Sequence, residues 1–130
     1  MEYAIPRQQA SEAVRELRDL IERERHLVDF VVEVRFTAGD DIWLSPAYGR
    51  ETCYIGCLAY RRQGCERYFR SVERLMRSLE GRPHLGKLHY LDAEELTLAY
   101  PRLGDFLEVR RRLDPDRLFG NRYLDGLLAG

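Results

Sequence analysis

The sequence predicts an α+β fold: an antiparallel sheet covered by two long helices and followed by short C-terminal helices. Two stretches with helical periodicity alternate with strand-like segments in the first 81 residues. No glycine-rich phosphate-binding loop joins a strand to a helix, which argues against a parallel, nucleotide-binding sheet. A chain of 130 residues is long enough to bury one core. We expect a single domain over residues 1–130, with the sheet and long helices in about 1–81 and a C-terminal segment in about 82–130.

The first two predicted elements are a strand and a long helix. Residues 2–5 form a short extended start that Pro6 closes. From about Arg7 to Glu24, apolar residues recur at three- and four-residue spacing with charged residues between them. This spacing places the apolar side chains on one face of a helix.

Two further strands are predicted before the second helix. The stretch from Asp29 to Thr37 alternates, so Glu33 and Arg35 share one face. Its apolar members face the other way: Val32, Val34 and Phe36. The stretch from Thr52 to Tyr60 is apolar on both faces, which is typical of a central strand.

The second long helix is predicted over about Cys65–Leu79, where seven apolar residues form one stripe. Gly81 is expected to stop this helix, and Pro83 lies just beyond it. The stretch from His84 to Tyr90 is expected to be extended, with Leu85 and Lys87 on the same side.

Short helices are predicted for the remaining chain. Asp92 and Glu95 have the spacing of a capping box, which predicts a helix start. Pro101 ends that helix, and residues 105–112 and 122–128 have the pattern of two more.

Composition and charge exclude several classes of function. The chain has 21 basic and 22 acidic residues, whereas a nucleic-acid-binding domain normally carries a clustered basic excess. The N-terminal residues lack the features of a secretory signal, and no apolar run is long enough to span a bilayer. We therefore expect a cytoplasmic protein, with peripheral attachment to a membrane left open.

Neither the histidines nor the three cysteines have zinc-ligand spacing, so no metal is expected. Cys53 and Cys57 lie about 13 Å apart if the strand rises ~3.3 Å per residue, which is too far for a disulfide. We expect buried, reduced thiols.

Two small groups of residues are candidates for chemistry. A carboxylate beside a guanidinium, as at Glu33 and Arg35, offers both acceptors and donors to a polyhydroxy ligand. The alternative is an ordinary ion pair on an exposed sheet face. Lys87 is the only lysine among the basic residues, and its ammonium could stabilise a developing alkoxide. His84 could donate a hydrogen bond or carry a proton, although both residues could also be plain surface residues.

Six segments together resemble one family in the same order along the chain. They are Glu33–Arg35, Asp41–Arg50, Arg82–Lys87, Tyr100–Arg102, Arg111–Pro115 and Leu118–Leu124. The family is the C-terminal region of FAD-dependent sugar-1,4-lactone oxidases, which include D-arabinono-1,4-lactone oxidase, L-gulonolactone oxidase and the bacterial alditol oxidases. The chain departs from the family at Leu85, where the family usually has tryptophan.

The resemblance implies the cap, or substrate, domain of an oxidoreductase of the vanillyl-alcohol-oxidase type. In such enzymes a separate domain binds FAD, and hydride passes from a carbinol carbon of the substrate to flavin N5. By similarity, Glu33, Arg35 and Lys87 hold the sugar lactone or polyol, and Lys87 with Arg35 polarises the oxygen that becomes the carbonyl. His84 and Asn121 are implied to lie at the cofactor.

The resemblance also implies that residues of about 82–130 pack on a flavin-binding domain. Without such a domain the polypeptide is not expected to turn over substrate. A cap face separated from its partner should expose an apolar patch, so we expect a flavin-domain partner or self-association. The alternative is a non-catalytic module that keeps the cap fold for small-ligand binding or oligomerisation.

Overall fold

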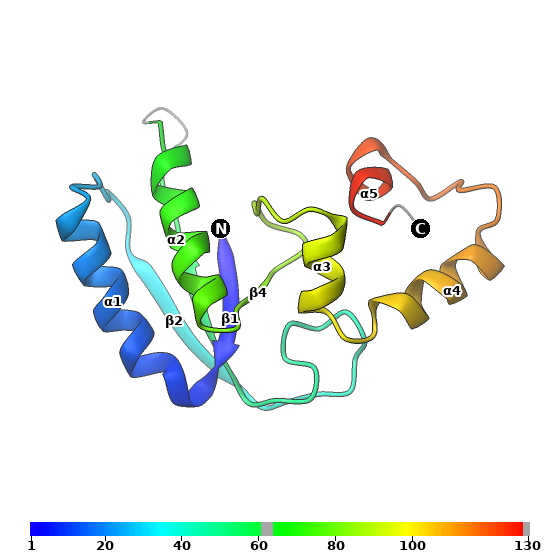
Figure 1. Ribbon diagram of the computed structural model, residues 1–130, viewed down its shortest axis with the longest axis horizontal. Helices are drawn as coiled ribbons and strands as arrows, with labels where there is room; N and C mark the ends of the chain where they lie inside the picture. The colour runs from blue at the N-terminus through cyan, green and yellow to red at the C-terminus, as the bar shows by residue number, and fades with distance from the viewer. Residues whose placement is uncertain (61–63, 129–130) are drawn as a thin grey trace.

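The computed structural model describes residues 1–60 and 64–128, and its core is a four-stranded antiparallel sheet. In chain order the elements are β1 (Glu2–Pro6), the 3₁₀ turn η1 (Arg7–Gln9), α1 (Ala10–Arg23), β2 (Val32–Thr37), β3 (Thr52–Cys57), α2 (Glu66–Ser78), β4 (Arg82–Pro83), α3 (Ala93–Ala99), α4 (Leu103–Leu113) and α5 (Arg122–Leu127). The strand order is β2-β3-β1-β4. Figure 1 shows α1 and α2 along the sheet, and α3, α4 and α5 to one side of it. The predicted α+β fold is confirmed.

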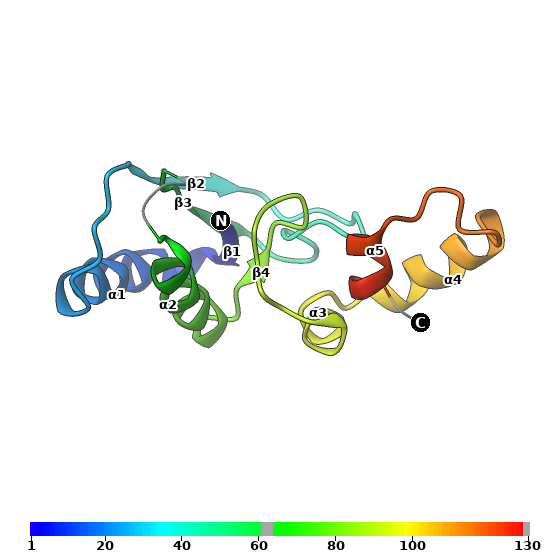
Figure 2. The ribbon, with the colours of Figure 1, turned by 90° about the horizontal axis from the view of Figure 1, so that it is seen from above.

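The core lies between the sheet and the two long helices. Alternate residues of β1 and β3, among them Tyr3, Ile5, Cys53 and Ile55, are almost completely buried against α1 and α2. In Figure 2 both helices lie on this side of the sheet, and none of the described helices covers the opposite side. β3 is central, as its apolar composition predicts, and one face of the sheet remains open.

The two long helices form where the periodicity predicts them. The first predicted helix, about Arg7–Glu24, is observed as η1 followed by α1, and the second as α2. The apolar stripe of α1 is buried in the core: Ala10, Ala13, Leu17 and Leu20. Burying an apolar stripe of this kind contributes most of the stability of such helices.

α2 ends in a Schellman motif. The residue with left-handed backbone is Glu80 (φ 55°), and Gly81 follows it. The N–H of Gly81 donates to the carbonyl of Met76 at 2.8 Å, and the N–H of Glu80 donates to that of Arg77 at 3.1 Å. A Cβ at Gly81 would lie 2.5 Å from the Met76 carbonyl oxygen. Gly81 therefore marks the helix end as predicted, but because of close backbone approach rather than a positive φ.

The expected extended segment from His84 to Tyr90 is wrong. β4 contains only Arg82 and Pro83, and the chain then turns. The N–H of Gly86 donates to Nδ1 of His84 at 3.0 Å, and the N–H of Lys87 donates to the His84 carbonyl at 2.9 Å. These bonds satisfy the backbone locally, so the segment does not continue as a strand. As a result, Leu85 and Lys87 contribute to different parts of the molecular surface.

Two of the three C-terminal helices, α3 and α5, begin at side-chain caps. The capping box of Asp92 and Glu95 is present at the start of α3, as predicted. Asn121 caps α5, its side-chain oxygen accepting the N–H of Leu124 at 2.9 Å. The observed bounds of α4 and α5 differ from the predicted helices by a few residues or fewer, which is usual for helix ends.

Arginines tie the long loop between β2 and β3 to the rest of the molecule. Arg82 donates to the carbonyl of Tyr48 at 2.7 Å, and Arg50 donates to that of Ala4 at 3.1 Å. The guanidinium of Arg102 lies over the ring of Trp43, 4.9 Å from its centroid. The loop is thereby fixed between the sheet and the C-terminal helices.

The predicted reduced thiols are observed at Cys53 and Cys57. Both are buried and free of disulfides, and desolvation by burial raises the pKa of each thiol. Cys65 is also a free thiol, but it is only half-buried, so the prediction of burial is wrong there. Within residues 1–60 and 64–128, no helix has the length and apolar character that crossing a membrane requires.

Candidate active site on the open sheet face

Four charged side chains gather on the face of the sheet that α1 and α2 leave open. We call Glu2, Glu33, Arg35 and Lys87 the open-face cluster. Glu2 belongs to β1, Glu33 and Arg35 to β2, and Lys87 to the turn after β4. The register of β2 on β3 confirms that Glu33 and Arg35 share a face, because each pairs with alternate residues of β3.

Glu2 is the centre of this cluster. Its side chain is almost completely buried, and its Oε2 accepts a hydrogen bond from Lys87 Nζ and forms an ion pair with Arg35 Nη2 at 2.7 Å. Lys87 and Arg35 themselves remain 42% and 56% exposed. An ammonium has three donors and a guanidinium has five. Both cations therefore keep donors available on the outer side of the cluster.

Gly56 makes room for the two carboxylates. It is the register partner of both Glu2 and Glu33, in the strand between theirs. A Cβ at Gly56 would lie 3.3 Å from Glu33 Oε2 and 3.7 Å from Glu2 Oε2. A larger residue would press on the Glu33 carboxylate, so the absence of a side chain lets both acids lie against the sheet.

Tyr54 borders the cluster as the register partner of Arg35. The Arg35 guanidinium lies 6.0 Å from the centroid of its ring, at the limit of a cation–π contact. Burial raises the pKa of the Tyr54 hydroxyl, and the carboxylates of Asp40 and Glu2 raise it further. Tyr54 therefore stays neutral and offers a hydroxyl beside the charged groups.

His84 is joined to the cluster through the backbone. Its N–H donates to the carbonyl of Glu2 at 2.9 Å, and its own carbonyl accepts the N–H of Lys87. Its Nδ1 accepts the N–H of Gly86, so in the neutral ring Nε2 carries the proton. The imidazole thus has a fixed tautomer and one nitrogen available as a donor.

Asn121 lies in a different part of the molecule. Its side-chain oxygen is used to cap α5, and in the described part of the chain it makes no hydrogen bond to the open-face cluster. α5 does reach the turn that carries Lys87, because the hydroxyl of Tyr123 donates to the carbonyl of Leu85 at 2.9 Å.

Sequence reasoning missed Glu2. Its only local signal is alternation, which places it on the face opposite Tyr3. The pairing that brings it beside Arg35 and Lys87 joins residues distant in sequence, and nothing in the local pattern specifies that pairing.

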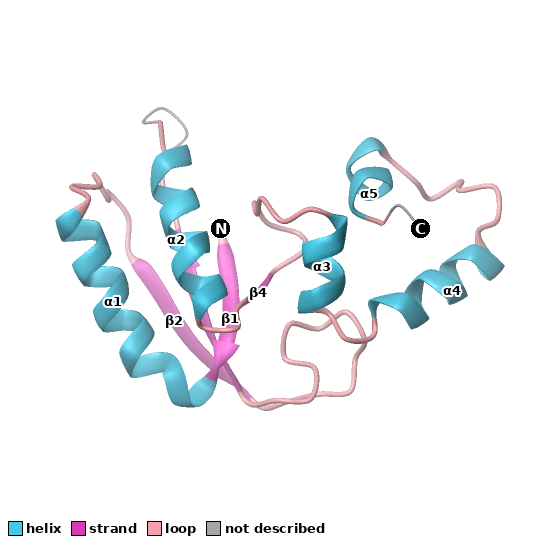
Figure 3. Cartoon of the chain, viewed as in Figure 1, coloured by secondary structure: helices cyan, strands magenta, loops and turns pink. Residues whose placement is uncertain are grey.

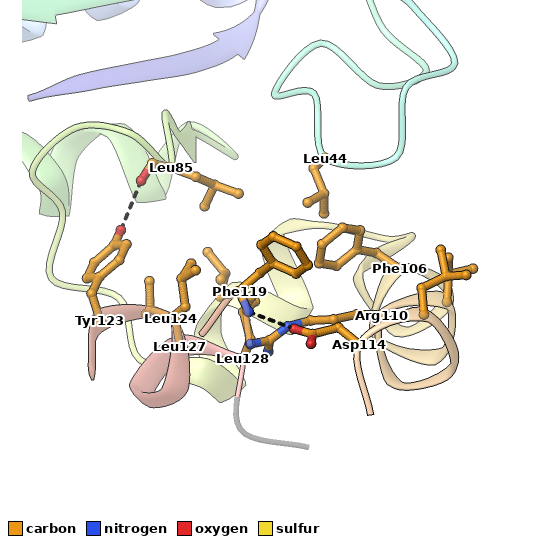
Figure 4. A pocket seen from close by; sticks show the side chains of 13 residues that line it. Leu44, Leu85, Phe106, Arg110, Asp114, Phe119, Tyr123, Leu124, Leu127 and Leu128 are labelled. Atoms are coloured by element: carbon orange, nitrogen blue, oxygen red, sulfur yellow. Dashed lines mark hydrogen bonds between the residues drawn. The ribbon is translucent and has the colours of Figure 1, made fainter. Parts of the chain in front are cut away.

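An apolar groove of about 370 Å³ lies between the C-terminal helices and the turn after β4 (Figure 4). It is lined by Leu44, Leu85, Leu96, Phe106, Val109, Arg110, Leu113, Asp114, Phe119, Tyr123, Leu124, Leu127 and Leu128. Figure 4 shows Leu44 and Leu85 on one side of the groove, opposite side chains of α4 and α5. The pattern of the sequence did not identify this groove.

The described residues contain no group of three or more His, Cys, Asp or Glu side chains arranged to hold a metal ion. Carboxylates, a guanidinium, an ammonium and a phenol are the polar groups described above on this face, with the His84 imidazole in the adjoining turn.

Comparison with known proteins gives a consistent family. The family model described as D-arabinono-1,4-lactone oxidase matches residues 1–127. An L-gulono-1,4-lactone dehydrogenase of Mycobacterium tuberculosis is 50% identical over 129 residues, which is 99% of this chain and 30% of that protein. The L-gulonolactone oxidase of Mus musculus is 38% identical over 95% of this chain and 29% of its own length. An alditol oxidase of a Streptomyces species is 35% identical over 99% of this chain and 31% of its own length.

The chain spans about 30% of the length of these relatives. The match of the family model extends from β1 to α5 and includes the whole open-face cluster. The predicted resemblance is confirmed, and the chain belongs to the D-arabinono-1,4-lactone oxidase family.

Proposed function

We propose that this chain is the substrate-binding part of an FAD-dependent oxidoreductase that oxidises a hydroxyl group of a sugar-1,4-lactone or a related polyol. The observation that carries the proposal is the open-face cluster, in which Arg35 and Lys87 converge on one buried oxygen of Glu2 while keeping donors free. The names of the relatives, a lactone dehydrogenase, a lactone oxidase and an alditol oxidase, support a substrate of this class.

The cations of the cluster suit the oxidation of an alcohol. Hydride leaves a carbinol carbon more readily as the attached hydroxyl releases its proton to water, and nearby cations stabilise the resulting oxyanion. In this proposal Lys87 Nζ and the Arg35 guanidinium bind that oxygen. Glu33, whose carboxylate lies on the same face, accepts hydrogen bonds from neighbouring hydroxyls and fixes the orientation of the substrate.

The residues that the resemblance places at the cofactor have hydrogen-bonding groups that suit FAD binding. FAD, when bound, supplies the hydride acceptor. His84 has Nε2 free to donate to a polar group of the cofactor, because Nδ1 is used within the turn. Asn121 uses its oxygen for the helix cap and keeps its amide NH₂ as a donor. We propose that both residues lie at the cofactor edge.

In the same proposal the C-terminal segment of about 82–130 packs on a flavin-binding domain. The apolar groove supports this, because its lining is almost entirely hydrocarbon and Phe119 at its edge is largely exposed. Apolar surface of this kind commonly marks a protein–protein interface.

A hybrid enzyme tests the proposed function directly. In the M. tuberculosis relative, the matching 30% is replaced by this chain, which is 50% identical to it. Adding L-gulono-1,4-lactone or xylitol without an electron acceptor should bleach the flavin absorbance of the hybrid. As a second format, the chain is mixed with the remaining part of the relative, expressed separately. A hybrid that folds and binds flavin, but whose flavin absorbance is bleached by none of the lactones or polyols added, would contradict the proposal.

A further inference from the structure

We propose that Glu2 is a positioning residue for this site: its buried carboxylate holds the Lys87 ammonium and the Arg35 guanidinium together over the open face. The inference rests on the proposed function and extends it to a residue outside the substrate-contacting set. Glu2 has only 2% of its surface exposed, whereas both of its cationic partners are partly open to solvent.

The shared oxygen is the main argument. Both cations bind the same Oε2 of Glu2, from opposite ends of the sheet's strand order. Two cations so close together repel each other unless an anion lies between them. A carboxylate this deeply buried is itself costly unless it is paired. Each charge therefore requires the others, and the three groups adopt one arrangement.

Glu2 also fixes the turn that carries Lys87. Its carbonyl accepts the N–H of His84, and the carbonyl of His84 accepts the N–H of Lys87. One residue of β1 thus holds this turn by its backbone and the Lys87 ammonium by its side chain. Because β1 and β2 both pair with β3, the same strand arrangement sets the position of Arg35.

This geometry separates an inner from an outer side of the cluster. Glu2 takes up donors on the inner side, next to Gly56, where its carboxylate is almost completely buried. Lys87 and Arg35 are 42% and 56% exposed, so the donors that Glu2 does not use are accessible from solvent. Glu2 therefore acts on an alcohol oxygen only through these two cations.

The first experiment uses the chain alone and needs no flavin. Lys87 is the only lysine in the sequence, so acetylation of its side chain reports one site. Glu2→Gln keeps the size of the side chain and removes its charge. We expect Lys87 to be acetylated several-fold faster in Glu2→Gln, measured by mass spectrometry of the peptide that contains it. Glu12→Gln, a neutralised glutamate on the exposed side of α1, is the control and should leave the rate unchanged.

The second experiment uses the hybrid enzyme. Glu2→Gln should lower kcat by about 10- to 100-fold, the range seen when partners of site residues are removed. KM should change less, because the outward donors are displaced rather than deleted. Glu2→Asp keeps the charge on a shorter arm, and it should recover part of kcat and slow the acetylation of Lys87. If Glu2→Gln does not fold, Glu2→Asp alone is compared with Glu12→Gln and should show a smaller change in the same direction.

The two experiments fail in different ways. Acetylation of Lys87 at the control rate in Glu2→Gln would overturn the positioning role, and so would faster acetylation with an unchanged kcat. An unsubstituted hybrid that folds and binds flavin but shows no turnover argues against the proposed function itself. In that case the acetylation rate decides whether Glu2 holds Lys87.

Discussion

Lys87 differs from the other basic residues in both its chemistry and its surroundings. An ammonium is a compact charge that presents donors in three directions, whereas a guanidinium is flat and broad. Lys87 directs one donor to buried Glu2 from a tight turn. In a chain that otherwise uses arginine, a lysine at this position is consistent with the need for a point charge.

The role of Lys87 leads to a first prediction, made for the hybrid enzyme. Lys87→Ala should reduce kcat by about 10²- to 10³-fold, because a preorganised donor to the developing oxyanion is lost. Arg15→Ala removes an exposed cation from α1 and is the matched control. Steady-state oxidation of the lactone measures both. The alternative function, a non-catalytic module with the cap fold, requires the two variants to behave alike.

Elements with strong periodicity were predicted well, and elements set by specific contacts were not. α1 and α2 bury one face each, so the spacing of their apolar residues reveals them, and the alternation of β2 reveals that strand although Val34 and Phe36 are exposed. The turn after β4 depends on a bond from the Gly86 N–H to the His84 ring. No periodicity encodes such a bond, and the apolar and polar residues of this turn have a pattern similar to that of a strand.

The same distinction applies to the candidate site. Glu33 and Arg35 were found because they interrupt an apolar strand at alternate positions, and Lys87 because it is unique in the sequence. Glu2 lies next to both cations only after β1 has paired with β3. Long-range pairing is the part of a fold that local sequence patterns specify least.

The end of α2 gives a prediction on stability. Gly81→Ala would place a Cβ 2.5 Å from the Met76 carbonyl oxygen, so the backbone must shift and the Schellman bonds weaken. We expect a loss of about 1–3 kcal/mol in the free energy of unfolding. Gly104→Ala is the control, since its Cβ meets nothing within 4 Å and it lies in α4. It should raise stability by about 0.5–1 kcal/mol. Urea unfolding measures both, and equal effects would contradict the explanation.

The contact between α5 and the chain before α3 should depend on pH through His89. The Tyr123 hydroxyl donates its hydrogen bond to the Leu85 carbonyl, so Nε2 of His89 must donate to that hydroxyl, at 2.9 Å. Nδ1 is then unprotonated and buried, and it has no hydrogen-bond partner among the described residues. Burial lowers the pKa of His89 below 6.5, and the nearby carboxylate of Glu73 only partly opposes this.

The lowered pKa of His89 determines how the free energy of unfolding changes with pH. The unfolded chain binds the His89 proton more readily, so His89 destabilises the fold as pH falls below 6.5, until the lower folded pKa is passed. Above pH 6.5 the penalty is absent. His89→Gln keeps a donor to Tyr123 and cannot titrate. Urea unfolding at about pH 7.5 and about pH 5.5 should show a smaller loss of stability in His89→Gln. An equal loss in both proteins would assign the pH dependence to other groups.

At the scale of the whole molecule, buried and exposed apolar surface are unevenly distributed. The core between the sheet and the long helices is well covered, whereas the C-terminal helices leave several large apolar side chains in solvent. Three of these, Leu113, Leu118 and Phe119, lie in or next to α4 and the segment before α5. The chain spans about 30% of the length of the M. tuberculosis relative. This region is where we expect the flavin-binding domain of the proposal to pack.

Association of the molecule should therefore depend on this exposed region. Leu118 and Phe119 are 80% and 81% exposed, so replacing both with glutamate should cost little stability. The double variant should lower any concentration-dependent self-association of the chain and weaken its binding to the remaining part of the M. tuberculosis relative. Leu27→Glu is the control, because Leu27 is 84% exposed but lies outside the C-terminal segment and does not line the apolar groove. Sedimentation velocity over a range of concentrations measures the first effect, and recovery of lactone-dependent flavin bleaching measures the second. If Leu27→Glu and the double variant behaved alike in both measurements, general hydrophobicity rather than this surface would explain the association, and the flavin domain would have to pack elsewhere.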